Sequence, residues 1–205
     1  MRLHRSLRKL LAATALALAL PCGTQAADAP SFDCAKARPN TVEDRICGDA
    51  TLADLDKRMA AVYAQAVTAV KSGIPNPRAS QRAWLKSRGQ CMRPNAPEPN
   101  TCIAFLYRNR IAELLARYSL TPQTGQANLA CGKPATRVVI RFYSPPEGGV
   151  AIAARGAQAA TLYQEQTASG IRYADAAGRI DYVEHQGEAK LTWGNGRTQE
   201  CRLLK

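Results

Sequence analysis

SLTPQTGQAN, residues 119–128, separates two halves of a 205-residue chain that have different hydrophobic periods. This stretch is polar, contains Pro122 and Gly125, and has no apolar repeat, so it predicts a linker. Before it, apolar residues recur at steps of three and four, and after it they alternate with polar residues. Helices followed by strands indicate two domains, a small all-α domain and then a small all-β domain.

Three helices are expected in the first half. The first and the third each carry one apolar stripe at helical spacing, which is typical of helices that share a core. Thr51 and Asp54 resemble a capping box at the start of the first helix, and Gly73 with Pro75 ends it. The expected helices cover about 51–72, 80–88 and 101–118.

The second half consists of short alternating runs separated by turn signals. Val138, Ile140 and Phe142, for example, share one face of the first run. Short strands spaced at about ten residues, with glycine-containing turns between them, are typical of a small antiparallel barrel or sandwich. The expected strands cover 138–143, 150–154, 160–164, 171–174, 179–183 and 189–193.

The first 26 residues have the pattern of a secretory signal peptide. Basic residues precede an uncharged run at 10–20, small residues follow at 24–26, and the mature chain is expected to start at Ala27. The apolar run is only about half of the roughly 20 residues that a membrane-spanning helix needs. No later stretch is long or apolar enough to span, so we expect a soluble periplasmic protein. Leucine and proline precede Cys22, where a lipid attachment site needs small residues, which argues against a lipid anchor.

Removal of the leader leaves six cysteines, an even number that favours a disulfide framework in an exported chain. Six cysteines can pair in many ways, but these fall along the chain as two close pairs and one distant pair. No pair has CxxC spacing, and His185 is the only histidine after the leader, which argues against a metal site. The expected bridges are Cys34–Cys47, Cys91–Cys102 and Cys131–Cys201.

Charge and motifs exclude several classes of protein. The formal charge is +12, and removing the four basic residues of the leader leaves +8. Lys and Arg are dispersed among acids, which argues against a nucleic-acid partner, and no phosphate-binding glycine loop is present. A Ser169–His185 pair, or the carboxylates of Asp181 and Glu184, are the remaining arrangements with catalytic chemistry, and no motif supports either. We expect a protein that is not an enzyme and holds no cofactor.

Several residues of the helical half occur together in a characteristic order. They are CAKA at 34–37, VEDRIC at 42–47, Leu52, Leu55–Asp56, Tyr63, QRAWL at 81–85, Arg88, Cys91 and Arg110. This set resembles the LprI-type lysozyme inhibitor domain over about residues 31–118. The resemblance implies binding to lysozyme, without defining a mechanism for this half.

The strand half has Cys131 and Cys201 near its ends and TASGIRYA at 167–174. These features are similar to the MliC/PliC family of periplasmic or lipid-anchored inhibitors of C-type lysozyme, over about residues 130–204. The resemblance implies a small antiparallel barrel.

In that family, the serine of an SGxxY loop and the lysine of a following Lys-Gly turn enter the lysozyme cleft and bind its two catalytic carboxylates. Ser169, Gly170 and Tyr173 match the first loop. A hydroxyl donates well to a carboxylate, and glycine allows a close backbone approach. At the second loop this chain departs from the family, because His185 and Gln186 precede the glycine. Either side chain offers a hydrogen bond that lacks the charge assistance of a lysine.

The net positive charge opposes association with a C-type lysozyme, because these enzymes are typically basic. Four acids near the expected loops would offset this repulsion as a steering face if they are exposed. They are Asp175, Asp181, Glu184 and Glu188.

Together these features predict a periplasmic lysozyme inhibitor, most simply of the C-type enzyme, that blocks the glycosidase cleft with its serine loop. The alternative is a cell-envelope module that binds peptidoglycan or another protein on the same scaffold. A hydrolase that uses Asp181 or Glu184 is a second alternative. The predicted parts are a leader at 1–26, a helical domain at 27–118, a linker at 119–128 and a barrel domain at 129–205.

Mass spectrometry of the exported protein tests the leader and the cysteines together. We expect a mature chain that starts near Ala27 and takes up no alkylating reagent unless a reductant is added, because all six remaining cysteines are paired. Alkylation of the folded, unreduced protein would contradict the framework of three bridges.

Overall fold

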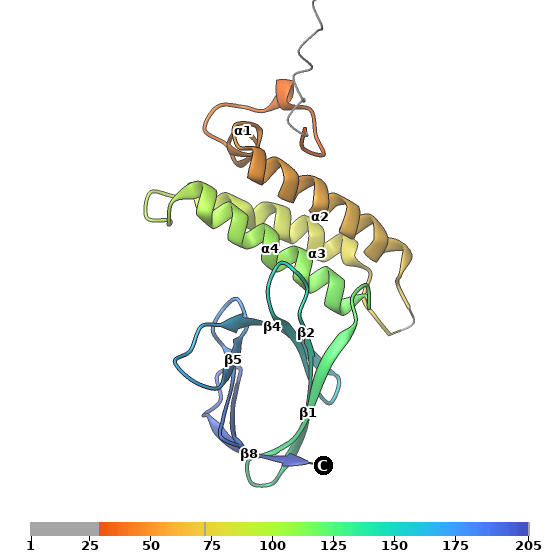
Figure 1. Ribbon diagram of the computed structural model, residues 1–205, viewed down its shortest axis with the longest axis vertical. Helices are drawn as coiled ribbons and strands as arrows, with labels where there is room; N and C mark the ends of the chain where they lie inside the picture. Colours follow the sequence, from red (N-terminus) through yellow and green to blue (C-terminus); the bar gives the residue numbers. More distant parts are fainter. Residues whose placement is uncertain (1–28, 72, 205) are drawn as a thin grey trace, which may run out of the picture.

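A computed structural model describes residues 29–71 and 73–204, and it shows a group of helices lying against a closed β-barrel (Figure 1). The predicted leader, the start at Ala27 and Cys22 lie outside the described residues. The first part forms η1 (Cys34–Lys36), α1 (Val42–Cys47), α2 (Ala50–Thr68), α3 (Pro77–Ser87), η2 (Arg88–Met92) and α4 (Pro99–Arg117). The second part forms β1 (Gln123–Cys131), β2 (Thr136–Tyr143), β3 (Val150–Arg155), β4 (Gln158–Glu165), β5 (Ile171–Ala174), β6 (Ile180–His185), β7 (Glu188–Trp193) and β8 (Gln199–Leu204). The predicted order, all-α and then an all-β barrel, is confirmed.

The helix starts are set by side-chain caps. Asp49 caps α2, because its carboxylate accepts a hydrogen bond from the backbone N–H of Leu52 at 3.1 Å. The capping box predicted from Thr51 and Asp54 is wrong, since both residues lie inside the helix. Helix α1, capped by Thr41, was not predicted. Its six residues are too few to show an apolar stripe.

The core of the helical part lies mainly between α2 and α4. The apolar stripe of each helix faces the other, and the two predicted disulfide bonds of this part are confirmed. The Cys34–Cys47 bond fastens η1 to the end of α1, and the Cys91–Cys102 bond fastens η2 to α4. The described ranges contain no helix that is long and apolar enough to cross a membrane. The largest fully buried side chains here are Ile46, Leu52, Ile103, Tyr107, Ile111 and Leu114.

The eight strands pair in sequence order, and β1 also pairs with β8, which closes the barrel. Alternate residues such as Val138 and Ile140 point inward and are fully buried. The third predicted disulfide bond, Cys131–Cys201, is confirmed and joins residues that lie opposite each other on β1 and β8. The barrel is therefore closed by backbone hydrogen bonds and by one covalent bond.

Strand β1 begins at Gln123, inside the stretch 119–128 that was predicted to be a linker. Only Ala127, Leu129 and Cys131 of this strand are buried. The first half of the strand is polar because both of its faces are in contact with solvent. The pairing of that half with β2, from Gln123 opposite Tyr143 onward, leaves no mark on the composition.

The two parts share a buried contact. Helix α4 crosses the outer wall of the barrel at β2, β3 and β4 (Figure 1), where Ala112 and Ala116 pack against Tyr143 and Val150. Small side chains on α4 let the helix approach the sheet closely. A second contact is the ion pair between Arg58 of α2 and Glu147 of the β2–β3 connection.

A chain of polar contacts runs along the edge of this interface. Arg110, with a side chain only 3% exposed, donates to the carboxylate of Glu113 at 2.8 Å. The other oxygen of Glu113 forms an ion pair with Arg117 at 3.1 Å, and Arg117 donates to the Thr161 hydroxyl of β4 at 2.7 Å. One carboxylate on α4 thus neutralises two arginines and orients the one that reaches the barrel.

We predict that Glu113→Gln lowers the free energy of unfolding by about 1.5–3 kcal/mol, the range for lost hydrogen bonds to charged groups, because it leaves the buried Arg110 without its counter-charge. Urea denaturation of the whole chain measures the change. The matched control is Asp181→Asn, which removes the exposed pair of Asp181 with Arg172 and should cost less than about 1 kcal/mol. Equal effects of the two substitutions would contradict this account.

Candidate functional site

The two predicted loops meet at one end of the barrel. The loop between β4 and β5 holds Ser169 and Gly170, and the turn between β6 and β7 holds Gln186. Pairing of Ile171 with Glu184 places the loop beside the end of β6. The strand directions put both connections at the same end of the barrel.

Gly170 seats the serine loop on the neighbouring strand. Its φ is +73°, and a Cβ atom there would overlap the carbonyl oxygen of Glu184 and approach the Cα atom of His185 to 3.2 Å. Both the conformation and the space admit only glycine. The close backbone approach that was predicted for Gly170 is therefore an approach within the protein itself.

Ser169 lies at the exposed tip of this loop. The hydroxyl of Thr167 donates to the carbonyl oxygen of Ser169 at 3.0 Å, which fixes the backbone of the tip. The Ser169 hydroxyl itself has no hydrogen-bond partner within the described part of the chain. It is free to donate to an acceptor on another molecule.

The neighbouring turn presents Gln186. Its φ is +50° and that of Gly187 is +83°, and His185 pairs with Glu188 across the turn. Two successive positive φ values define the mirror-image hairpin turn that matches the twist of the strands. His185 and Gln186 are both exposed, and they lie at the same end of the barrel as Ser169.

Tyr173 has a different place from the one predicted. It was expected to bind a partner, but it is only 6% exposed and points into the barrel, where its ring centroid lies 5.2 Å from that of Phe142. Burial raises the pKa of its hydroxyl. Strand alternation explains this, since Arg172 takes the outward position. Tyr173 therefore supports the loop from inside.

The chain matches two families of inhibitors in succession. Residues 33–114 match the family described as lysozyme inhibitor LprI, and residues 130–200 match the family described as membrane-bound lysozyme inhibitor of c-type lysozyme, MliC. The chain contains an LprI domain followed by an MliC domain. Proteins named lipoprotein LprI from Mycobacterium bovis and Mycobacterium tuberculosis are 29% identical to it over 173 residues, 84% of this chain and 83% of theirs. No solved structure matches the chain significantly.

The four acids of the predicted steering face have different roles in the MliC domain. Asp175 caps the β5–β6 turn at the far end of the barrel, and Asp181 forms a two-pronged ion pair with Arg172 at 3.0 and 3.1 Å. Glu184 accepts a hydrogen bond from Tyr182, and Glu188 is exposed beside the turn. Only Glu184 and Glu188 therefore lie next to the loops.

This arrangement also bears on catalysis. Asp181 and Glu184 are three positions apart on β6 and so face opposite sides of the strand, which prevents them from acting on one substrate as acid and base. No hydrogen bond joins Ser169 to His185 among the described residues. Nor do those residues contain a cluster of acids, cysteines and histidines that would hold a metal ion. The two inhibitor domains point to a protein that is not an enzyme.

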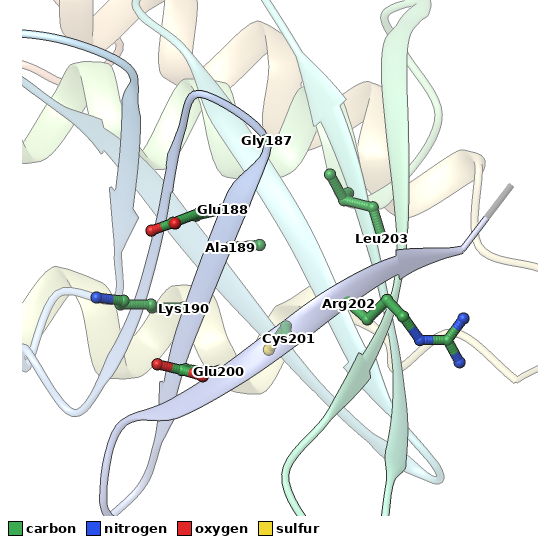
Figure 2. Close-up of a pocket in the computed structure, with 8 residues that line it drawn as sticks. All are labelled: Gly187, Glu188, Ala189, Lys190, Glu200, Cys201, Arg202 and Leu203. Atoms are coloured by element: carbon green, nitrogen blue, oxygen red, sulfur yellow. The ribbon is translucent and has the colours of Figure 1, made fainter.

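A shallow hollow of about 450 Å³ borders the Gln186 turn where β7 and β8 separate. Figure 2 shows the side chains of Glu188, Lys190 and Glu200 projecting from the same side of these strands. Lys190 is the nearest lysine to the turn along the chain. It stands three residues from Gly187, about 10 Å at 3.3 Å per residue, so it does not replace the missing lysine at the tip.

The matching residues of the LprI domain converge in its interior. Arg88 pairs with Glu43 at 2.8 Å and contacts the hydroxyl of Tyr107, which donates to Asp56 at 2.7 Å. The other oxygen of Asp56 accepts two hydrogen bonds from Ser31 at 2.7 and 2.5 Å. Burial raises the pKa of Tyr107 well above its usual value. These contacts hold the domain together, and Ser31, Glu43, Asp56 and Arg88 also line a hollow of about 670 Å³ on its surface.

Asp56 and Arg88 were recognised as residues of the LprI-type motif, but their shared hydrogen-bond network with Tyr107 was not predicted. The signal was present, because Asp56 falls on the apolar stripe of α2 between Leu55 and Met59. A carboxylate on a buried stripe requires several donors.

Gly170→Ala should destabilise the barrel by about 1–3 kcal/mol, because a side chain at positive φ is strained and here also meets the backbone of β6. Thermal unfolding measures the loss. Gly178→Ala is the matched control, since Gly178 has φ +65° but open space around it, and it should cost about 1 kcal/mol. Equal losses at both sites would show that the loop does not rest on β6 as described.

Proposed function

We propose that the protein is a periplasmic inhibitor of C-type lysozyme, and that the loop carrying Ser169 enters the glycosidase cleft. The matches to LprI and MliC support a lysozyme inhibitor of the cell envelope. The observation that carries the finer proposal is the placement of two exposed donors, Ser169 and Gln186, on adjacent rigid turns at one end of the barrel.

The chemistry of a glycosidase cleft suits these donors. Such enzymes act with a pair of carboxylates, which are strong acceptors for hydroxyl and amide groups. The Ser169 loop is held by Gly170 and Thr167, so little freedom is lost when it binds. Gln186 supplies a neutral donor where the family has a lysine, so each bond to a carboxylate is weaker than a charge-assisted one.

Inhibition assays with purified mature protein and C-type, G-type and I-type lysozymes test the proposal. We expect inhibition of the C-type enzyme, and we expect Ser169→Ala to weaken it by about 1–3 kcal/mol, the cost of a lost hydrogen bond to a charged group. Thr136→Ala removes an exposed hydroxyl from β2 at the far end of the barrel and should leave inhibition unchanged.

Gln186→Lys provides a test in the opposite direction. A lysine at this position restores charge assistance at the turn, so inhibition of the C-type enzyme should strengthen, and the gain should shrink as salt is added. Absence of inhibition of every lysozyme class by both the wild type and this variant would overturn the proposal. That outcome would favour a module that binds another envelope component.

A further inference from the structure

A groove of about 950 Å³ lies between the two domains and extends from Glu165, near the Ser169 loop, to the β5–β6 turn at Asp175 and Ala176. One side is formed by α4 and the connection that precedes it, and the other by the outer face of β4 and β5. Phe105 and Asn109 of α4 lie across the groove from Tyr163 and Glu165 of β4. No part of the proposed inhibitory loop lies in this groove, so its apolar lining has no role in the mechanism above.

Phe105 continues the face of α4 that packs on the barrel. It precedes Ala112 by seven residues and Ala116 by eleven, spacings that place all three on one side of an α-helix. Ala112 and Ala116 are buried against the barrel, whereas Phe105 is 57% exposed. It lies about 10 Å from Ala112 along the axis at 1.5 Å per residue. The face of α4 that packs on the barrel therefore continues beyond this contact to Phe105, whose aromatic ring is exposed to solvent.

Glu165 connects the groove to the inhibitory loop. It is the last residue of β4, and it lines both the groove and a second hollow that is bordered by Thr167 and Gly170. Glu165 is exposed and forms no ion pair among the described residues. A molecule that covers the Ser169 loop is therefore next to Glu165, and through Glu165 it adjoins the groove.

We propose that Phe105 and Glu165 form a second contact surface for the same lysozyme molecule that the Ser169 loop enters, an inference that rests on the proposed function. Two tight turns alone present much less than the roughly 800 Å² that each partner buries in a stable complex. The groove adds an aromatic anchor, the type of side chain that dominates binding energy in protein interfaces. The exposed carboxylate of Glu165, on the barrel side of the groove, suits a basic group of the partner, whereas the exposed Arg93 lies on the helical side.

A protein surface fits the groove better than a saccharide does. Phe105 is the only large ring of the groove that the described structure exposes, because Trp84 packs edge-on against Tyr107 at 4.9 Å and Tyr163 is largely buried against α4. Burial also raises the pKa of Tyr163, consistent with a covered hydroxyl. A single open ring beside an acid therefore favours a basic protein.

Inhibition of C-type lysozyme by full-length variants tests the inference. Phe105→Ala should raise the inhibition constant at least tenfold, and Glu165→Gln should reduce the salt dependence of the association rate. The matched control is Leu85→Ala, which truncates an apolar side chain that is 42% exposed but lies outside the groove, and it should change the constant less than twofold. All three variants should keep the thermal stability of the wild type, because the side chains are exposed.

The outcomes separate this inference from the proposed function. If Ser169→Ala weakens inhibition but Phe105→Ala leaves it within twofold of wild type, the groove is not a lysozyme contact and the loop proposal stands. If the wild type inhibits no lysozyme, the proposed function fails, and the groove inference fails with it. Binding of soluble peptidoglycan fragments that is lost in Phe105→Ala, with inhibition unchanged, would overturn the inference in favour of a glycan site.

Discussion

The packing of α4 on the barrel wall is the contact on which the arrangement of the protein depends. Ala112 and Ala116 bring the helix close to Tyr143 and Val150, and the helix then fixes the direction of everything attached to it. The same helix supplies six of the fifteen buried residues in the core of the LprI domain. It therefore shares its side chains between two cores, and it joins the helical domain to the barrel.

Polar contacts extend this coupling to the LprI motif. The amide of Gln81, in the Gln-Arg-Ala-Trp-Leu segment, accepts a hydrogen bond from Arg110 at 2.9 Å, and Arg110 begins the chain of contacts that reaches Thr161 of the barrel through Glu113 and Arg117. Residues that identify the helical family thus also support the position of the second domain. Their interior location explains why the motif alone does not define a mechanism.

Hydrophobic periods predicted α2, α4 and six of the eight strands, because the burial of one face of an element sets the spacing of its apolar residues. Cysteine spacing was sufficient for the three bridges. The start of β1 was missed because its first half is stabilised by backbone pairing, to which polar side chains such as Gln123 and Gln126 give no clue. Tyr173 was predicted as a binding residue because it belongs to the motif. The alternation of side chains along β5, which the motif does not describe, turns it into the barrel instead. The contact of α4 with the barrel depends on two alanines that no periodicity distinguishes from ordinary helix residues.

The bond between Cys131 and Cys201 has a consequence for survival in the cell envelope. The seam between β1 and β8 is four residue pairs long and joins the first and last strands of the barrel, so losing it would turn the closed barrel into an open sheet. An opened sheet exposes unpaired strand edges, which recruit other chains into aggregates and offer extended backbone to proteases. Because the covalent bond holds the first and last strands together, a transient loss of hydrogen bonds at the seam does not release an edge. The disulfide bond therefore keeps the barrel closed under conditions in which an unlinked sheet would open and then aggregate or be cleaved.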